Sequence, residues 1–243
     1  MNDLLVAVHP VNQKPILEIS VQTVAAARAA ERGGADRVEL CDNLSVGGLT
    51  PSKELIRQAR ARVRIPIFVM IRLRAGDFVY SDAELAQMKR SIGDAKESGM
   101  NGMVLGVLTK ERHVDVARTR ELVELARPLP TTFHRAFDEC ADLPQGLEDV
   151  IRAGAARILT SGGTAGAREG ASVLAGLVNA AGDRILIVPG AGINASNIAQ
   201  VVEQTGAQEF HSGLGSTLPY GSRDYKKFEA EVRNLAQVLS RLS

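Results

Sequence analysis

A short phrase recurs four times along the chain, and each copy joins a helix stop to a strand. Each copy opens with a glycine, the residue that most readily ends a helix, and continues into residues suited to a β-strand. The copies begin at Gly34, Gly99, Gly154 and Gly206. Successive starts lie 65, 55 and 52 residues apart, which is room for two strand–helix pairs in each interval. The repeat therefore predicts eight strands.

Four further runs of β-compatible residues alternate with these copies, one before each, and each run follows a proline or glycine. They cover residues 16–20, 67–72, 131–134 and 184–188. Apolar residues at helical spacing fill the stretches between strands and predict a last helix at about 224–241. Thr50 and Pro51 predict an N-cap followed by proline at the first helical position, and residues 81–84 predict a capping box.

Strict alternation of strands and helices predicts a parallel sheet with right-handed crossovers. An open doubly wound sheet shares this alternation, but it usually carries a glycine-rich phosphate loop after its first strand. Here the first strand ends in Ser20-Val21-Gln22, without such a loop. A length of 243 residues and eight strands favour closure. We therefore predict one α/β domain over residues 1–243, a TIM (β/α)8 barrel of eight parallel strands from about 16 to 212.

Composition narrows the classes of partner. The formal net charge is +1 and aromatic residues make up 4% of the chain, which argues against nucleic acid and anionic membranes. The first ten residues lack the basic start and apolar run of a targeting signal, so we expect a cytoplasmic protein. Two cysteines in a reducing compartment are expected to be free thiols. A metal ion or a small anionic ligand is the expected partner.

Aligning the four copies predicts which side chains share a face and a height in the barrel, because strand side chains alternate. One face points toward the helices: Val38, Met103, Ile158 and Phe210. The other face forms a low layer of Arg37, Gly102, Arg157 and Glu209, a middle layer of Glu39, Val104, Leu159 and His211, and a rim of Cys41, Gly106, Ser161 and Gly213. The remaining strands send inward Glu18, Ser20, Met70, Arg72, Thr132 and His134.

Such an ionic interior must be paired or must bind something, since unpaired buried charges are costly. For the low layer we expect a salt-bridge network that fills the barrel. For Glu39, Arg72, His134 and His211 we expect a functional site, because they lie toward the C-terminal ends of the strands, where barrel sites are built.

Two kinds of chemistry are candidates at this end of the barrel. Anion binding is predicted from side chains and glycine-rich loops after the third, seventh and eighth strands: Arg72, Arg74, Gly190, Gly192, Ser212 and Gly213. Acid–base catalysis is predicted for Glu39, His134 and His211. The imidazoles of the two histidines ordinarily titrate close to neutral pH.

Metal binding is a third candidate. Carboxylates and imidazoles that would suit a divalent ion are Glu18, Glu39, His134, Asp138 and His211. Cys41 is the one soft ligand at the rim, and Cys140 is expected to be a surface or helix-packing thiol.

Several motifs in order resemble the CutC copper homeostasis family. They are Val38-Glu-Leu-Cys41, Gly47-Gly-Leu-Thr-Pro-Ser52, Phe68-Val-Met-Ile-Arg72 with Arg74 and Gly76-Asp-Phe78, Thr132-Phe-His-Arg-Ala-Phe-Asp138, Leu159-Thr-Ser-Gly162 and Glu209-Phe-His211. The resemblance spans residues 16–217 and implies a cytosolic TIM barrel, often oligomeric, that is associated with copper tolerance or trafficking. We expect a homo-oligomer, with a dimer favoured.

The resemblance also implies copper as the bound ion, with two cysteines as ligands. Cys41 matches one of them, whereas the other falls on Ser20, and a hydroxyl is a poor ligand for copper(I). Two hypotheses follow. One is a copper-handling protein that binds an ion near Cys41, with His211 or Cys140 as a further ligand. The other is an enzyme that acts on a small phosphorylated or carboxylated substrate, with Arg72 and the loop of residues 190–192 holding the anion and His134, Glu39 or His211 moving a proton. A scaffold that interacts through its outer helices is a third alternative, and exposed apolar patches would indicate it.

Overall fold

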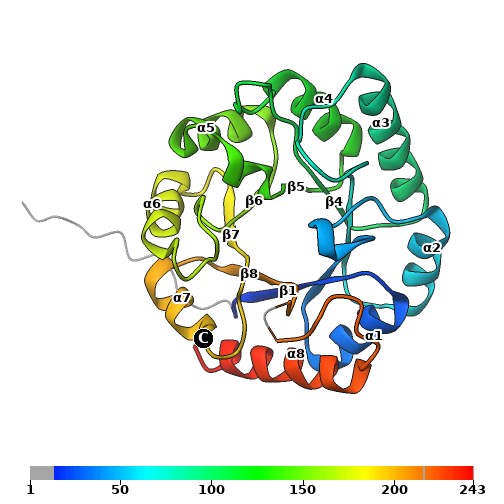
Figure 1. Ribbon diagram of the computed structural model, residues 1–243, viewed down its shortest axis with the longest axis vertical. Helices are drawn as coiled ribbons and strands as arrows, with labels where there is room; N and C mark the ends of the chain where they lie inside the picture. The colour runs from blue at the N-terminus through cyan, green and yellow to red at the C-terminus, as the bar shows by residue number, and fades with distance from the viewer. Residues whose placement is uncertain (1–13, 216, 243) are drawn as a thin grey trace, which may run out of the picture.

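Eight strands and eight α-helices alternate along the chain and form a ring in which the helices surround the strands (Figure 1). The computed structural model describes residues 14–215 and 217–242, so the N-terminal stretch used to predict localisation lies outside the described residues. The strands are β1 (Ile16–Val21), β2 (Arg37–Leu40), β3 (Ile67–Met70), β4 (Gly102–Leu105), β5 (Thr131–Phe133), β6 (Arg157–Thr160), β7 (Leu186–Pro189) and β8 (Glu209–Ser212). No helix in this part of the chain is long and apolar enough to cross a membrane.

The helices lie close to the predicted positions. They are α1 (Val24–Gly33), α2 (Lys53–Arg62), α3 (Asp82–Glu97), α4 (Val116–Ala126), α5 (Leu143–Ala153), α6 (Ala171–Ala181), α7 (Ile198–Thr205) and α8 (Tyr225–Ser240). Two short 3-10 helices, η1 (Leu44–Val46) and η2 (Arg135–Glu139), follow β2 and β5.

The sheet is parallel throughout and runs in the order β7-β6-β5-β4-β3-β2-β1-β8. The first strand lies between β2 and the last strand, with Glu18 opposite both Arg37 and His211. β7 and β8 lie side by side in Figure 1 without ladder pairing among the described residues, and Pro189 at the end of β7 has no N–H to donate. The predicted eight-stranded TIM barrel is confirmed, with one seam.

Helix ends explain the recurring phrase. Gly34, Gly154 and Gly206 follow α1, α5 and α7 with φ of 96°, 87° and 66°, the left-handed conformation that suits a glycine after a helix. Gly99 has φ of 73° just beyond α3. Each copy therefore ends a helix and leads the chain into the next even-numbered strand.

One predicted helix start is wrong. α2 begins at Lys53, and Ser52 caps it by accepting a hydrogen bond from the Leu55 N–H. Thr50 is occupied elsewhere, because its hydroxyl oxygen accepts from the Arg72 N–H at 2.8 Å and its hydroxyl donates to the Arg72 carbonyl at 3.1 Å. This pairing extends the chain past Pro51 and delays the helix. The predicted capping box of Ser81 and Glu84 at α3 is confirmed.

The predicted low layer is an ion-pair network. Arg37 Nε lies 2.5 Å from Glu18 Oε2, and another Arg37 nitrogen lies 2.6 Å from Glu209. Arg157 Nε lies 3.3 Å from the same Glu209 oxygen. Because each carboxylate faces a guanidinium, this part of the interior is neutralised within the barrel, as the sequence predicted.

Phe68 of β3 enters the same layer. Its ring lies beneath both guanidinium groups, 4.7 Å from Arg37 Cζ and 4.4 Å from Arg157 Cζ. Gly102 makes the room, since a Cβ there would lie 2.5 Å from Phe68 Cζ. The glycine in the repeat is thus the gap that an aromatic ring from the neighbouring strand fills.

Candidate metal and ligand site at the barrel mouth

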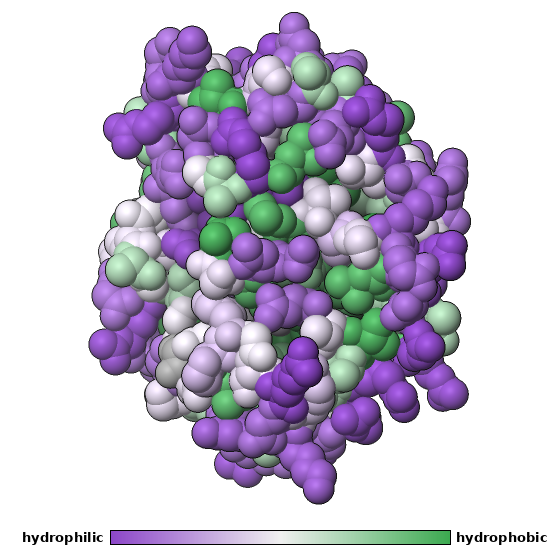
Figure 2. All heavy atoms as spheres, turned by 45° about the vertical axis from the view of Figure 1, so that its right-hand side comes forward, coloured by the Kyte–Doolittle hydropathy of each residue, from purple (hydrophilic) through white to green (hydrophobic). Residues whose placement is uncertain are grey.

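A cavity of about 340 Å³ lies at the C-terminal ends of the strands, which we call the mouth. Figure 1 shows η1 and the segment after β8 inside the ring of helices, over this end of the barrel. An oblique view in Figure 2 shows hydrophilic side chains around the edge and apolar side chains nearer the middle. The residues that line the mouth cavity include Ser20, Glu39, Met70, Arg72, Phe78, His134, Arg135, His211 and Tyr220.

Glu18, Glu39 and His211 form a buried cluster in which candidate ligand atoms lie within 4.8 Å of one another. His211 Nδ1 lies 2.7 Å from Glu18 Oε1, while the other Glu18 oxygen is bound by Arg37. Glu39 differs, because its Oε2 is buried and has no hydrogen-bond partner among the described residues. The predicted middle layer thus places Glu39 beside His211, with one carboxylate oxygen available.

The environment separates the pKa values of the two glutamates. Burial alone would raise the pKa of Glu18, but the Arg37 charge and the His211 contact reverse this and lower it to about 2. Burial raises the pKa of Glu39 to about 7, with the nearby His211 acting in the opposite direction. For His211, burial lowers the pKa, but Glu39 and Glu18 outweigh it and the net direction is upward.

Cys41 does not line the mouth cavity and has no exposed surface. It packs with Phe68, Met70 and Val104, and its Sγ lies 3.9 Å from Glu39 Oε1. Burial and then the Glu39 charge raise the pKa of this thiol well above its usual value. Cys41 is therefore a protonated core thiol beside the carboxylate cluster.

Cys140 is half-buried beside α5 and lines a separate small pocket with His113 and Gln145. Burial, followed by the Asp149 charge, raises its pKa to about 12. Since it does not line the mouth cavity, it fits the predicted helix-packing thiol.

Arg72 leaves the end of β3 and points into the mouth cavity. Its terminal nitrogens donate to loop carbonyls, at 2.7 Å to Val46, 3.2 Å to Gly48 and 3.1 Å to Gly76. The guanidinium lies over the Phe78 ring, 4.8 Å from its centroid. Arg72 Nε is buried and has no hydrogen-bond partner among the described residues.

His134 follows β5 and packs against the same Phe78 ring, with centroids 4.9 Å apart. Its Nδ1 accepts a hydrogen bond from the Ala136 N–H at 3.2 Å, while its buried Nε2 has no partner in the described part of the chain. Burial, with the Arg72 charge adding to it, lowers the pKa of His134 to about 3. His134 is neutral near pH 7, with Nε2–H as a donor.

Arg74 faces away from this cavity. It binds Glu84 at 2.6 Å and Asp77 at 2.9 Å, and its guanidinium lies over the Tyr80 ring. The structure therefore separates the two arginines that the sequence grouped as an anion site.

The loops after β7 and β8 reach the mouth only in part. Gly192, Ser212 and Gly213 line the mouth cavity, whereas Gly190 packs against Leu159. The Ser212 hydroxyl is engaged, since it donates to the Ile193 carbonyl at 2.6 Å and accepts from the Leu214 N–H at 3.1 Å. Its role as an anion ligand stays a prediction.

Asp138 acts as a structural acceptor. Its carboxylate accepts hydrogen bonds from the Thr160 hydroxyl, the backbone N–H groups of Ser161 and Gly163, and the Arg135 guanidinium. It holds the loop after β6 against η2, so its oxygens are occupied.

The sequence missed two aromatic residues of the mouth cavity. Phe78 lies in the predicted Gly76-Asp-Phe78 motif, but nothing in its local pattern indicates that Arg72 and His134 pack on it. Tyr220 lies on a long segment after β8 and lines both the mouth cavity and a neighbouring one. Only the tertiary contact reveals either position.

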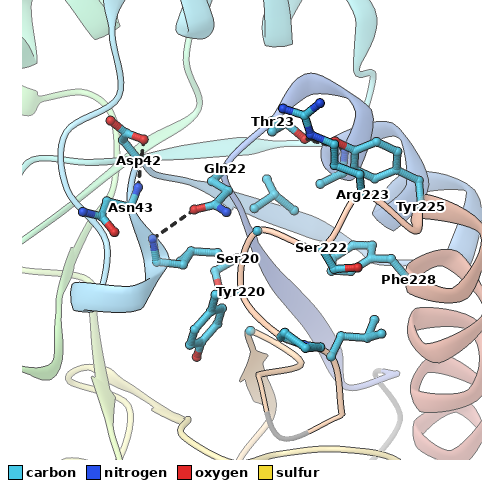
Figure 3. Close-up of a pocket in the computed structure, with 17 residues that line it drawn as sticks. Ser20, Gln22, Thr23, Asp42, Asn43, Tyr220, Ser222, Arg223, Tyr225 and Phe228 are labelled. Carbon is cyan, nitrogen blue, oxygen red and sulfur yellow. Dashed lines mark hydrogen bonds between the residues drawn. The ribbon is translucent and has the colours of Figure 1, made fainter.

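The neighbouring cavity has a volume of about 510 Å³ and lies between the end of β1, the loop before η1 and the start of α8 (Figure 3). Its labelled side chains come from segments far apart in the sequence, including Gln22, Asn43 and Arg223. Gln22 Oε1 accepts a hydrogen bond from the Leu44 N–H at 3.1 Å, which ties η1 to the end of β1.

The fold and the site define an α/β barrel with a buried carboxylate–histidine cluster under a ligand-sized cavity. Residues 15–216 match the CutC family, and the chain belongs to that family. It is 49% identical over 197 residues to a family protein CutC from Chromobacterium violaceum, covering 81% of this chain and 80% of that protein. It is 45% identical over 208 residues to the human copper homeostasis protein cutC homolog, covering 86% of this chain and 76% of that protein.

Two solved structures are similar to this chain, one of them a CutC protein. A CutC protein from Streptococcus agalactiae superposes with a TM-score of 0.78 at 33% identity, covering 82% of this chain and 98% of that one. A structure described as native KDPGal has a TM-score of 0.62 at 13% identity, covering 95% of this chain and 97% of that one, and shows the shared fold alone.

Proposed function

We propose that this chain serves copper homeostasis by binding one metal ion in the mouth cavity, with Glu39 and His211 as ligands. The human relative is named a copper homeostasis protein, and the family is shared. The observation that carries the proposal is Glu39 Oε2, a buried carboxylate oxygen that has no partner among the described residues and lies beside an imidazole. A buried acceptor of this kind is costly unless something binds it.

The residues present do not fit a two-thiolate copper(I) site. Ser20 stands where the second soft ligand would be needed, and Cys41 is fully buried and does not line the cavity. Imidazole and carboxylate instead suit a divalent ion such as Cu²⁺ or Zn²⁺. In this chain the predicted ligand Cys41 therefore serves as packing beside the cluster, and His211 is the predicted ligand that the proposal retains.

Glu18 has a supporting part in this proposal. Its contact with His211 Nδ1 favours the tautomer that leaves the Nε2 lone pair for a metal, an arrangement that orients many metal-bound histidines. Arg37 holds the other Glu18 oxygen and fixes the carboxylate. Three strands thus contribute two ligands, Glu39 of β2 and His211 of β8, together with the orienting Glu18 of β1 and its anchor Arg37 of β2.

Metal titration of the purified protein tests this proposal. Cu²⁺ and Zn²⁺ are each titrated by calorimetry into the parent, Glu39→Gln and His211→Asn, with Cys41→Ser and Cys140→Ser as controls. We expect one tight site that both ligand variants lose and both thiol controls keep. Loss of binding in Cys41→Ser with retention in Glu39→Gln would instead assign the ion to the thiol and overturn the proposed ligand set. Circular dichroism confirms that each variant is folded.

A barrel enzyme acting on a small phosphorylated or carboxylated substrate is the second candidate function. The buried Arg72 favours it, because no carboxylate lies within ion-pair distance of that guanidinium in the described residues. Glu39, His134 and His211 would then be the groups that transfer protons at the cavity. Turnover of a small phosphorylated or carboxylated compound by metal-free protein, lost in Glu39→Gln, would favour this function over metal binding.

The cytoplasm remains the proposed location and a dimer the proposed assembly.

A further inference from the structure

Two side chains that line the mouth cavity each carry a buried N–H group that has no acceptor among the described residues. One is Arg72 Nε and the other is His134 Nε2. Neither belongs to the carboxylate cluster, and the proposed metal ligands do not satisfy them. Buried donors in folded proteins nearly always have partners, so an orphaned pair in one cavity calls for a ligand.

Arg72 is held as a cation without a counter-ion. Arg72 is only 6% exposed, and the acceptors of its hydrogen bonds are neutral backbone carbonyls. Other interior arginines differ. Arg37 has Glu18 and Glu209, and Arg157, which also keeps N–H groups without acceptors, has Glu209 as its counter-ion. Arg72 is therefore positioned to attract an anion, because a buried unpaired charge is costly.

The loop carbonyls also fix the direction of Arg72 Nε. Val46 and Gly48 hold one terminal nitrogen, and Gly76 holds the other. With both terminal nitrogens anchored and the guanidinium over Phe78, the Nε–H is held in one orientation, which lowers the entropy lost when an acceptor binds.

His134 supplies the second donor, which is also held in place by a hydrogen bond to another atom of the same side chain. Its Nδ1 is an acceptor for Ala136, so the proton of the neutral ring is on Nε2. Gly106 permits this position, since a Cβ there would lie 2.6 Å from His134 Cε1. The ring is therefore fixed by packing on one side and by a hydrogen bond on the other.

Both groups converge on Phe78, at 4.8 Å from Arg72 Cζ and 4.9 Å from the His134 centroid. We propose that this part of the mouth cavity is an oxyanion subsite, in which Arg72 Nε–H and His134 Nε2–H bind the carboxylate or phosphate group of a small molecule. A volume of about 340 Å³ admits a metabolite-sized ligand and no polymer. The subsite uses side chains other than the proposed metal ligands in the same cavity, and it rests on the second candidate function, a site for a phosphorylated or carboxylated small molecule.

The test uses chelator-treated, metal-free protein with inorganic phosphate in one arm and pyruvate in the other, against chloride at matched ionic strength. Binding is measured by calorimetry, and the Arg72 Nε–H signal is followed by NMR in the parent protein. Arg72→Lys keeps the charge and removes the Nε–H. His134→Asn keeps an acceptor near Ala136 and removes the Nε2–H. Arg74→Lys is the matched control on the same loop.

We expect at least one anion to bind and to shift the Arg72 Nε–H signal. Each of the two subsite variants should weaken binding by about tenfold, the equivalent of one charge-assisted hydrogen bond, while the Arg74 control stays within about twofold. Binding of phosphate alone or of pyruvate alone identifies the ligand class. Absence of binding at millimolar concentration, an unshifted Arg72 signal, or parent-like affinity in both folded variants would overturn the proposal. The NMR arm decides the outcome if a variant does not fold.

Discussion

Glu18 and His211 meet through a 2.7 Å contact between residues 193 positions apart in the sequence. They are also direct partners in the ladder between β1 and β8, so closing the sheet is what brings the carboxylate to the imidazole. The buried cluster is therefore a product of the topology, since it exists only when the first and last strands pair.

The first prediction concerns Glu18→Gln. The amide keeps the shape of the side chain but removes the charge that holds His211 Nδ1–H, so His211 loses its fixed tautomer. We expect Cu²⁺ or Zn²⁺ affinity to fall by roughly 10- to 100-fold, as for other second-layer partners of metal-bound histidines. Calorimetric titration measures it. Glu84→Gln, in a half-buried ion pair with Arg74 away from the mouth cavity, is the control and should bind as the parent does.

The second prediction compares a buried arginine with an exposed one. Arg37→Met leaves Glu18 and Glu209 without their main counter-ion inside the barrel, and we expect a loss of about 3–5 kcal/mol in the free energy of unfolding. Arg184→Met removes a solvent-exposed pair with Glu148 and should leave the free energy of unfolding nearly unchanged, because water screens the two charges. Urea unfolding of both variants measures the difference. Equal losses would show that the interior network is not a stabilising unit.

The third prediction concerns Gly106→Ala. A Cβ at this position would collide with the His134 ring at 2.6 Å, so the ring must move away from the cavity. We expect a destabilisation of about 1–3 kcal/mol and weaker anion binding. Gly176→Ala, inside α6 with no atom within 4 Å of the added Cβ, should instead stabilise by roughly 0.5–1 kcal/mol. Thermal unfolding measures the change in stability, and calorimetry measures the change in anion affinity. A Gly106→Ala protein with parent-like stability and anion affinity would show that Gly106 is not needed to position the His134 ring.

The fourth prediction is a pH dependence that His134 causes. Its pKa is about 3 in the folded protein against 6.5 for an ordinary histidine, so between these values the unfolded chain binds a proton that the folded chain does not. The contribution of neutral His134 to the free energy of unfolding is complete above pH 6.5. It decreases as the pH falls toward 3, by up to about 1.4 kcal/mol for each pH unit.

Urea unfolding of the parent and His134→Asn between pH 7 and pH 4 measures this dependence, since the other titrating groups are common to both proteins. The parent should lose stability more steeply than the variant over that range. Parallel curves would show that His134 is not buried in its neutral form.

The repeat made the barrel predictable, and it also placed side chains at the correct heights. Glycines that end helices and β-compatible runs that follow them are local signals, so the strands and the low ion-pair layer could be predicted from Arg37, Arg157 and Glu209. Strand alternation then predicted that Glu39 and His211 lie together, because it needs only register.

The loops were less predictable, because their contacts depend on partners far away in the sequence. Arg72 and Arg74 are two residues apart and look equivalent in the sequence, yet loop carbonyls hold one over the cavity and Glu84 holds the other away from it. Thr50 failed as an N-cap for the same reason, since the backbone of Arg72 binds its hydroxyl. Neither side-chain type nor spacing contains this information.

The last prediction concerns the two thiols and bears on how copper could bind. Cys41 has no exposed surface and a raised pKa, whereas Cys140 is half-buried with a pKa of about 12.

Thiolates are the reactive form, so both cysteines should react slowly with iodoacetamide at pH 8 in the native protein, and Cys41 should react only when the barrel unfolds. Mass spectrometry of Cys140→Ser, which leaves Cys41 as the single thiol, should show modification that follows the urea unfolding curve. Cys41→Ser is the matched control for the more accessible thiol. Rapid labelling of Cys41 in folded protein would mean that this thiol, just after β2, is accessible to small molecules. Cys41 would then be a candidate copper ligand again, in place of Glu39.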